Sequence, residues 1–173
     1  MPLRKPKSIP KIPKTRKKKA HTALSAIPLK KPDKLEYICK AYYMYDEKIK
    51  KQFCVFAIET LVEFTSFAYE ISVEVIREKN IFYFIVTGLK AKMDAVPTVQ
   101  PARKELLFED LVGSYVVNVV KQDGAINTAD YKFNIYNKEI TLVKEYKPKK
   151  KNNRHFCSFE VAEDKFSFVP DLT

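Results

Sequence analysis

The stretch Tyr69–Lys92, which begins YEISVEVIREKNIFYFIVTGLK, is typical of a β-hairpin. We place the two-residue turn at Glu78–Lys79, which pairs Arg77 with Asn80. This register puts six apolar side chains on one face, namely Ile71, Val73, Val75, Phe82, Phe84 and Val86. The first strand alternates between apolar and polar residues, whereas the second is apolar on both faces. We therefore expect the second strand to lie inside a sheet.

Two segments before this hairpin are candidates for another one. Leu35–Tyr45 is rich in tyrosine, and Phe53–Phe64 is mostly apolar. Leu35–Tyr45 also shows helical spacing, and Asp33 with Glu36 resembles a capping box. Helix and strand both remain open for this segment, but its aromatic composition favours a strand.

A linker with two prolines, Ala91–Pro101, divides the body of the chain into halves of similar length. The next segment, Ala102–Val112, has leucines at helical spacing and is followed by Gly113, which predicts one short helix. Ser114–Lys121 is rich in valine, which predicts a strand.

Two further hairpins are expected near the C-terminus. A turn at Asn137–Lys138 pairs Tyr136 with Glu139 and gives one apolar and one polar face. A turn over Ala162–Lys165 pairs the phenylalanines and valine on its two sides. The apolar face of the first of these hairpins comprises Tyr131, Phe133, Ile135, Ile140 and Leu142.

These patterns predict an all-β fold. About eight strands with polar turns and one or two short helices are typical of an antiparallel sandwich or barrel, jelly-roll-like in layout. No segment pattern suggests a crossover between parallel strands. We expect two parts: a basic, disordered arm over residues 1–34 and a single antiparallel β domain over residues 35–173.

Composition excludes several classes of protein. Three glycines are too few for Gly-rich phosphate loops, and no run of about 18 apolar residues suggests a membrane span. The N-terminus shows no apolar secretion signal. Three cysteines, Cys39, Cys54 and Cys157, are too few for a disulfide framework. We expect a reducing compartment, cytoplasmic or nuclear, rather than secretion.

All of the net charge lies in the arm. Residues 1–34 hold twelve lysines and arginines and one acid, which accounts for the whole net charge of +11, while residues 35–173 are neutral. Six prolines in the arm prevent a continuous helix. A flexible arm of this charge binds polyanions by releasing counterions, with little sequence preference. We expect it to contact RNA or DNA phosphates through Arg4, Lys5, Lys7, Lys11, Lys14, Arg16, Lys17, Lys18 and Lys19.

Other interpretations of the arm remain open. The arm has no aromatic residue on which a base could stack, so it would not read sequence. The motif KTRKKK at residues 14–19 also resembles a nuclear import signal. An anionic membrane surface, or a solvated tail without a partner, would suit the same charge.

A second basic cluster lies between two predicted strands near the C-terminus. It is expected to extend the same phosphate-binding surface if the arm leaves the domain on that side, and a solvated loop is the alternative. Its members are Lys147, Lys149, Lys150, Lys151 and Arg154.

Catalytic and metal sites have little support in the sequence. His155 and Cys157 share a face of a predicted strand, and Asp164 could lie across the following turn. The other histidine, His21, lies in the arm. We therefore expect no enzyme activity, no metal site and no cofactor.

Two resemblances suggest functions. A Lys/Arg/Pro-rich arm on a neutral β body is similar to the layout of small jelly-roll coat proteins and of ribonucleoprotein components. It implies a structural protein that binds nucleic acid and forms a homo-oligomer or larger assembly. Residues 111–115, LVGSY, resemble the first strand of lipocalin-type barrels and imply the alternative, a small-ligand carrier or adaptor. Outward apolar positions on the first hairpin, Ile76, Ile81, Tyr83 and Ile85, are candidates for subunit contacts or for packing within the domain.

Overall fold

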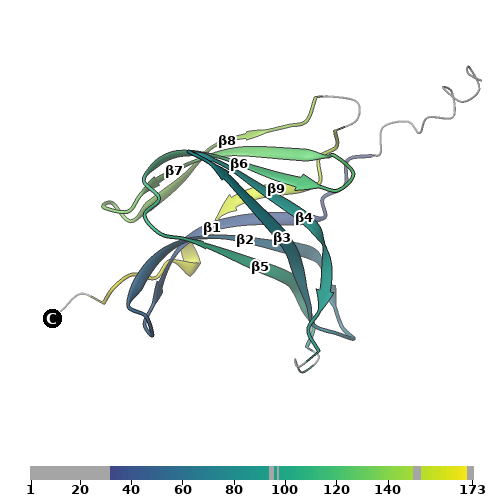
Figure 1. The fold of residues 1–173 in the computed structure, drawn as a ribbon, viewed down its shortest axis with the longest axis horizontal. Helices are drawn as coiled ribbons and strands as arrows, with labels where there is room; N and C mark the ends of the chain where they lie inside the picture. Colours follow the sequence, from purple (N-terminus) through teal and green to yellow (C-terminus); the bar gives the residue numbers. More distant parts are fainter. Residues whose placement is uncertain (1–31, 94–95, 97, 150–152, 171–173) are drawn as a thin grey trace, which may run out of the picture. The chain divides into compact units, whose positions relative to one another are not determined.

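The computed structural model describes residues 32–93, 96, 98–149 and 153–170 (Figure 1). The described chain is nearly all strand, and its helical structure is limited to one 3-10 turn, Glu163–Lys165. The all-β prediction is confirmed. The strands are β1 (Tyr37–Asp46), β2 (Lys51–Phe64), β3 (Tyr69–Glu78), β4 (Ile81–Ala91), β5 (Gln100–Phe108), β6 (Gly113–Lys121), β7 (Ile126–Asn134), β8 (Glu139–Tyr146) and β9 (Cys157–Val161).

The nine strands form one curled sheet in the order β8-β7-β6-β4-β3-β5-β2-β1-β9. Its two outer strands, β8 and β9, pack against each other, so the sheet is nearly closed into a barrel. Most neighbouring strands are antiparallel, as predicted. The pairs β1–β9, β3–β5 and β4–β6 are parallel, which the hairpin patterns did not predict.

The connections between the strands lie at two opposite ends of the sheet. β1 begins at the end where β2, β4, β6 and β8 finish and where β3, β5, β7 and β9 start. We call this the arm end, because residue 32 leads into β1 there. The opposite end, which carries the β1–β2, β3–β4, β5–β6 and β7–β8 turns, is called the far end.

The β3–β4 hairpin has the predicted faces but not the predicted register. Glu78 pairs with Ile81, so the turn is Lys79–Asn80 rather than Glu78–Lys79. Lys79 takes a left-handed conformation, with φ of 55°. From Val73 to Glu78 the register differs by two residues, which keeps each side chain on its face because strands have a period of two. A bulge between Ser72 and Val73 shifts the earlier pairs by one more residue.

The β7–β8 hairpin differs from its prediction in the same way. Asn134 pairs with Glu139 across a four-residue turn, and Lys138 adopts a left-handed φ of 54°. The predicted apolar face is confirmed, because Tyr131, Phe133 and Ile140 are buried.

The predicted helix over Ala102–Val112 is wrong. Gln100–Phe108 forms β5, which pairs with β2 along its length and touches β3. Residues four apart share a face in a strand as well as in a helix, so Ala102 and Leu106 are both buried here. Pairing with distant strands outweighs the local helical preference.

The last predicted hairpin is also wrong. β9 pairs in parallel with β1, and the chain then enters the 3-10 turn instead of a second strand. Phe166 and Phe168 instead pack against Tyr43, with ring centroids 5.3 and 5.4 Å away.

The preferred strand assignment for Leu35–Tyr45 is confirmed by β1, which forms a hairpin with β2. In that hairpin Cys39 lies opposite Ile58 and Cys54 opposite Tyr43, so these two cysteines are not cross-strand partners.

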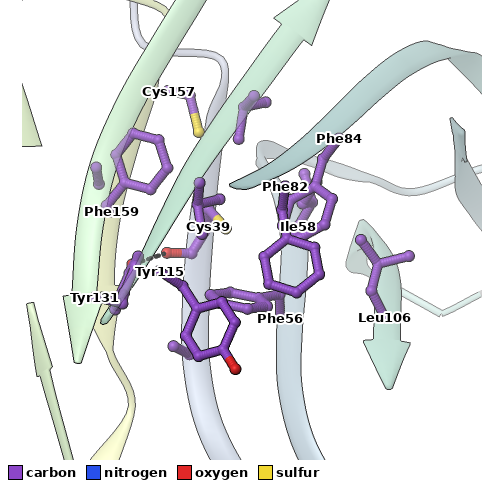
Figure 2. Packing of buried hydrophobic residues seen from close by; sticks show 14 of the residues in the cluster. Cys39, Phe56, Ile58, Phe82, Phe84, Leu106, Tyr115, Tyr131, Cys157 and Phe159 are labelled. Carbon is purple, nitrogen blue, oxygen red and sulfur yellow. Dashed lines mark hydrogen bonds between the residues drawn. The ribbon is translucent and has the colours of Figure 1, made fainter. Parts of the chain in front are cut away.

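Aromatic rings fill the interior of the sheet (Figure 2). Phe56 of β2 lies at the centre, and its ring centroid is within 6 Å of Phe82, Phe84, Tyr131 and Phe133. These rings come from β4 and β7, so one cluster ties strands that are far apart in the sheet. The centre is thus packed with side chains, as in small filled barrels.

Candidate polyanion-binding surface

The structure describes only part of the predicted phosphate-binding set. Arg4–Lys19, Lys150 and Lys151 lie outside the described residues, so their roles stay predictions. The described members are Lys147, Lys149 and Arg154, all in the connection between β8 and β9.

The chain enters the domain against this same connection. The amide N of His155 donates to Asp33 Oδ1 at 2.9 Å, and the amide N of Lys34 donates to the His155 carbonyl at 3.0 Å. One step further along, the amide N of Glu36 donates to the carbonyl of Phe156 at 2.8 Å. Figure 1 shows the start of the described chain beside the β8–β9 connection. Two parts of the sequence that carry excess lysine are thereby attached to one end of the sheet.

Two asparagines hold the second half of the β8–β9 connection in place. Asn127 is only 1% exposed, and its Oδ1 accepts from the amides of Phe156 and Cys157 at 2.9 and 2.8 Å. Its Nδ2 donates to the Arg154 carbonyl at 3.0 Å. Asn153 makes a matching pair of bonds with the backbone of Ile126. The residues next to the basic loop are therefore anchored to the start of β7.

Arg154 is engaged inside the protein. It is 8% exposed, and its guanidinium lies 2.9 Å from Glu36 and 3.4 Å from Asp123. Lys121 also forms an ion pair with Glu36. Arg154 is one of the predicted phosphate contacts. In the structure its guanidinium forms ion pairs with two carboxylates of the same domain. A contact between Arg154 and a phosphate stays a prediction.

The carboxylates of this cluster have altered pKa values. Burial raises the pKa of Glu36, but hydrogen bonds from Lys121 and Arg154 outweigh burial and bring the pKa below its ordinary value. The pKa of Asp123 is lowered chiefly by the hydrogen bond from the Ala125 amide, with Arg154 and Lys121 adding to the effect. Both carboxylates are therefore held in their charged form.

Lys34, Lys147 and Lys149 are exposed cations on or beside the β8–β9 connection. Lys34, the last residue of the basic arm, was not among the predicted phosphate contacts. Tyr146, which precedes Lys147, was not predicted either. It is 41% exposed, and its ring centroid lies 4.5 Å from the ammonium of Lys144. An exposed ring next to lysines offers a base a stacking surface that the arm lacks.

The residues considered for a metal site do not come together. His155 Nε2 lies 3.3 Å from Glu145 Oε1, while Cys157 is buried, which raises the pKa of its thiol. Asp164 lies in the 3-10 turn beyond the other end of β9. Within the described ranges, no group of three or more His, Cys, Asp or Glu side chains could hold a metal ion.

No helix in the described part of the chain is long and apolar enough to cross a membrane. Comparison with protein-family models, with curated proteins and with solved structures finds no match to this chain.

Proposed function

We propose that this chain is a non-enzymatic structural protein that binds nucleic acid. In this proposal the arm residues Arg4–Lys19 neutralise RNA or DNA phosphates, while the β domain makes protein contacts in a homo-oligomer or larger coat-like or ribonucleoprotein assembly. The observation that carries it is the hydrogen bonding of Asp33 and Lys34 to His155, which joins the arm to the domain beside Lys147 and Lys149. Positive charge gathered over one region favours phosphate binding without base recognition.

The β domain supports the second part of the proposal. Ile76, at an outward position of β3, is 47% exposed. An exposed apolar side chain on a strand is a candidate for a subunit contact. Ile81, Tyr83 and Ile85 of β4 are partly buried within the domain, which leaves Ile76 as the better candidate.

The alternative function, a small-ligand carrier, is less well supported. A carrier barrel needs room for its ligand, whereas Phe56 and its ring neighbours occupy the centre of this sheet.

Salt-dependent binding of the full chain to a fluorescent single-stranded oligonucleotide tests the phosphate contacts. We expect a Gln variant at Lys14, Arg16, Lys17, Lys18 and Lys19 to weaken binding. The slope of log K against log salt should become shallower by about 0.7 for each phosphate that the variant no longer neutralises. The loop variant Lys147→Gln with Lys149→Gln should have a smaller effect of the same kind.

The matched control is Lys48→Gln with Lys50→Gln, which removes two exposed lysines from the β1–β2 turn at the far end. Equal losses of oligonucleotide affinity in the loop variant and in this control would show that binding depends on net charge alone and not on the position of the lysines. Unchanged binding and slope in the arm variant would overturn the proposal. Light scattering with absorbance at nucleic-acid and protein wavelengths tests assembly, since particles that carry nucleic acid should dissociate in high salt.

A further inference from the structure

The arm end also carries an apolar surface that nucleic-acid binding does not use. Phe67 in the β2–β3 connection is 57% exposed, and Met93 after β4 is 89% exposed. Exposed apolar side chains gathered in this way mark interaction sites. We call the full set the apolar tip, which comprises Leu61, Val62, Phe67, Leu89, Met93, Val96 and Val99.

The two connections that form the apolar tip are directly joined. The amide N of Lys92 donates to the carbonyl of Ala68 at 2.8 Å, which links the end of β4 to the β2–β3 connection. The ring of Phe67 lies 6.4 Å from that of Tyr69, which in turn lies 4.7 Å from Phe64 at the end of β2. The apolar tip therefore lies where β2 and β4 end and β3 begins, rather than on a flat strand face.

Cationic side chains flank the apolar tip. Lys90 and Lys92 are both exposed. The sequence of residues 61–70 and 88–104 holds four cations, Lys90, Lys92, Arg103 and Lys104, and three acids, Glu63, Glu70 and Asp94, of which Asp94 lies outside the described residues. Glu70 is already paired with Lys104 Nζ at 2.5 Å. The surroundings of the apolar tip thus favour a partner that is both apolar and anionic.

We propose that the apolar tip inserts into the interfacial layer of an anionic lipid bilayer, with Lys90 and Lys92 against the lipid headgroups. A second copy of the chain complements this surface less well, because a symmetric contact would bring the same lysines together. A bilayer offers apolar chains below anionic headgroups. The +11 arm joins the sheet at the same end and supplies the second attachment that stable membrane binding requires.

The chain has no tryptophan, so one introduced indole is a unique reporter. We expect the emission of the full-length Phe67→Trp variant to shift to shorter wavelength on vesicles of phosphatidylcholine with phosphatidylserine. Brominated lipid should quench this emission. The control is Tyr136→Trp, at a residue 87% exposed in the β7–β8 turn of the far end, and its emission should not change.

Vesicle sedimentation at about 0.5 M salt distinguishes the contribution of the apolar tip to membrane binding from that of the arm, because this salt screens the charge of the arm. We expect Phe67→Ser with Met93→Ser to weaken vesicle binding about tenfold while oligonucleotide binding at low salt is kept. The far-end control, Ile49→Ser with Tyr136→Ser, should bind vesicles like the original chain.

Three outcomes would overturn the inference. The Phe67→Trp emission could stay unchanged while the protein sediments with vesicles, which would assign membrane binding to the arm alone. The original chain could fail to bind vesicles. Light scattering could show a dimer that Phe67→Ser with Met93→Ser dissociates, which would assign the apolar tip to a second copy.

Discussion

Arg154 Nη1 lies 2.9 Å from Glu36 Oε1 and thereby links the β8–β9 connection to the residue that precedes β1. The same guanidinium reaches Asp123 between β6 and β7. One nearly buried side chain thus joins three segments at the arm end. These ion pairs hold the segment before β1 against the β8–β9 connection.

Replacing Arg154 by Ala should destabilise the domain by about 2 kcal/mol, because the packing of a nearly buried side chain is lost and Glu36 and Asp123 each lose one of their partners. Urea unfolding followed by circular dichroism measures the change. Lys149→Ala, which removes an exposed cation from the same connection, should stay within about 0.5 kcal/mol. Equal stabilities of the two variants would show that the Arg154 ion pairs contribute nothing.

The lowered pKa values of Glu36 and Asp123 predict loss of stability in acid. A carboxyl whose pKa is lower in the folded state stabilises that state fully above its unfolded pKa. This contribution is lost as the pH falls through the folded value, so the loss should begin near the ordinary pKa of Glu36, 4.5. Melting temperatures measured from neutral pH downward should fall less steeply for Glu36→Gln than for the original chain. Parallel curves would contradict the assignment to Glu36.

Asn127→Ala should lower the free energy of unfolding by about 2 to 3 kcal/mol, because two buried backbone amides and one carbonyl lose their hydrogen-bond partner. Asn153→Ala provides the control, since its bonds to Ile126 are exposed to solvent and should contribute less than about 1 kcal/mol. Thermal unfolding of both variants gives the comparison. A milder effect at Asn127 than at Asn153 would argue against its role as the anchor of β9.

The three cysteines should resist thiol reagents in the folded protein. All three are buried, and burial raises the pKa of the Cys54 thiol to about 11. Burial raises the pKa values of Cys39 and Cys157 as well. A disulfide reagent such as Ellman's should therefore react slowly at pH 8 and modify all three in urea. A rapidly reacting thiol in the native protein would show that this part of the sheet opens.

The candidate site could be located from the sequence only in outline. The lysine clusters before residue 35 and after Tyr146 stand out by composition alone. The internal ion pairs of Arg154 could not be foreseen, because Glu36 and Asp123 approach it only when β1, β6 and β9 are assembled. The apolar tip was missed for a similar reason, since Phe67 and Met93 belong to different connections.

The sequence by itself determined the all-β class, the buried faces of the β3–β4 and β7–β8 hairpins and the concentration of charge in the first 34 residues. These properties depend on neighbours along the chain, because side chains in a strand alternate with a period of two. Only the tertiary structure decided the hairpin registers, the strand at Gln100–Phe108 and the parallel pairing of β9 with β1. Those features depend on partners far away in the sequence, and a shift of two residues or a change of partner leaves the local apolar pattern intact.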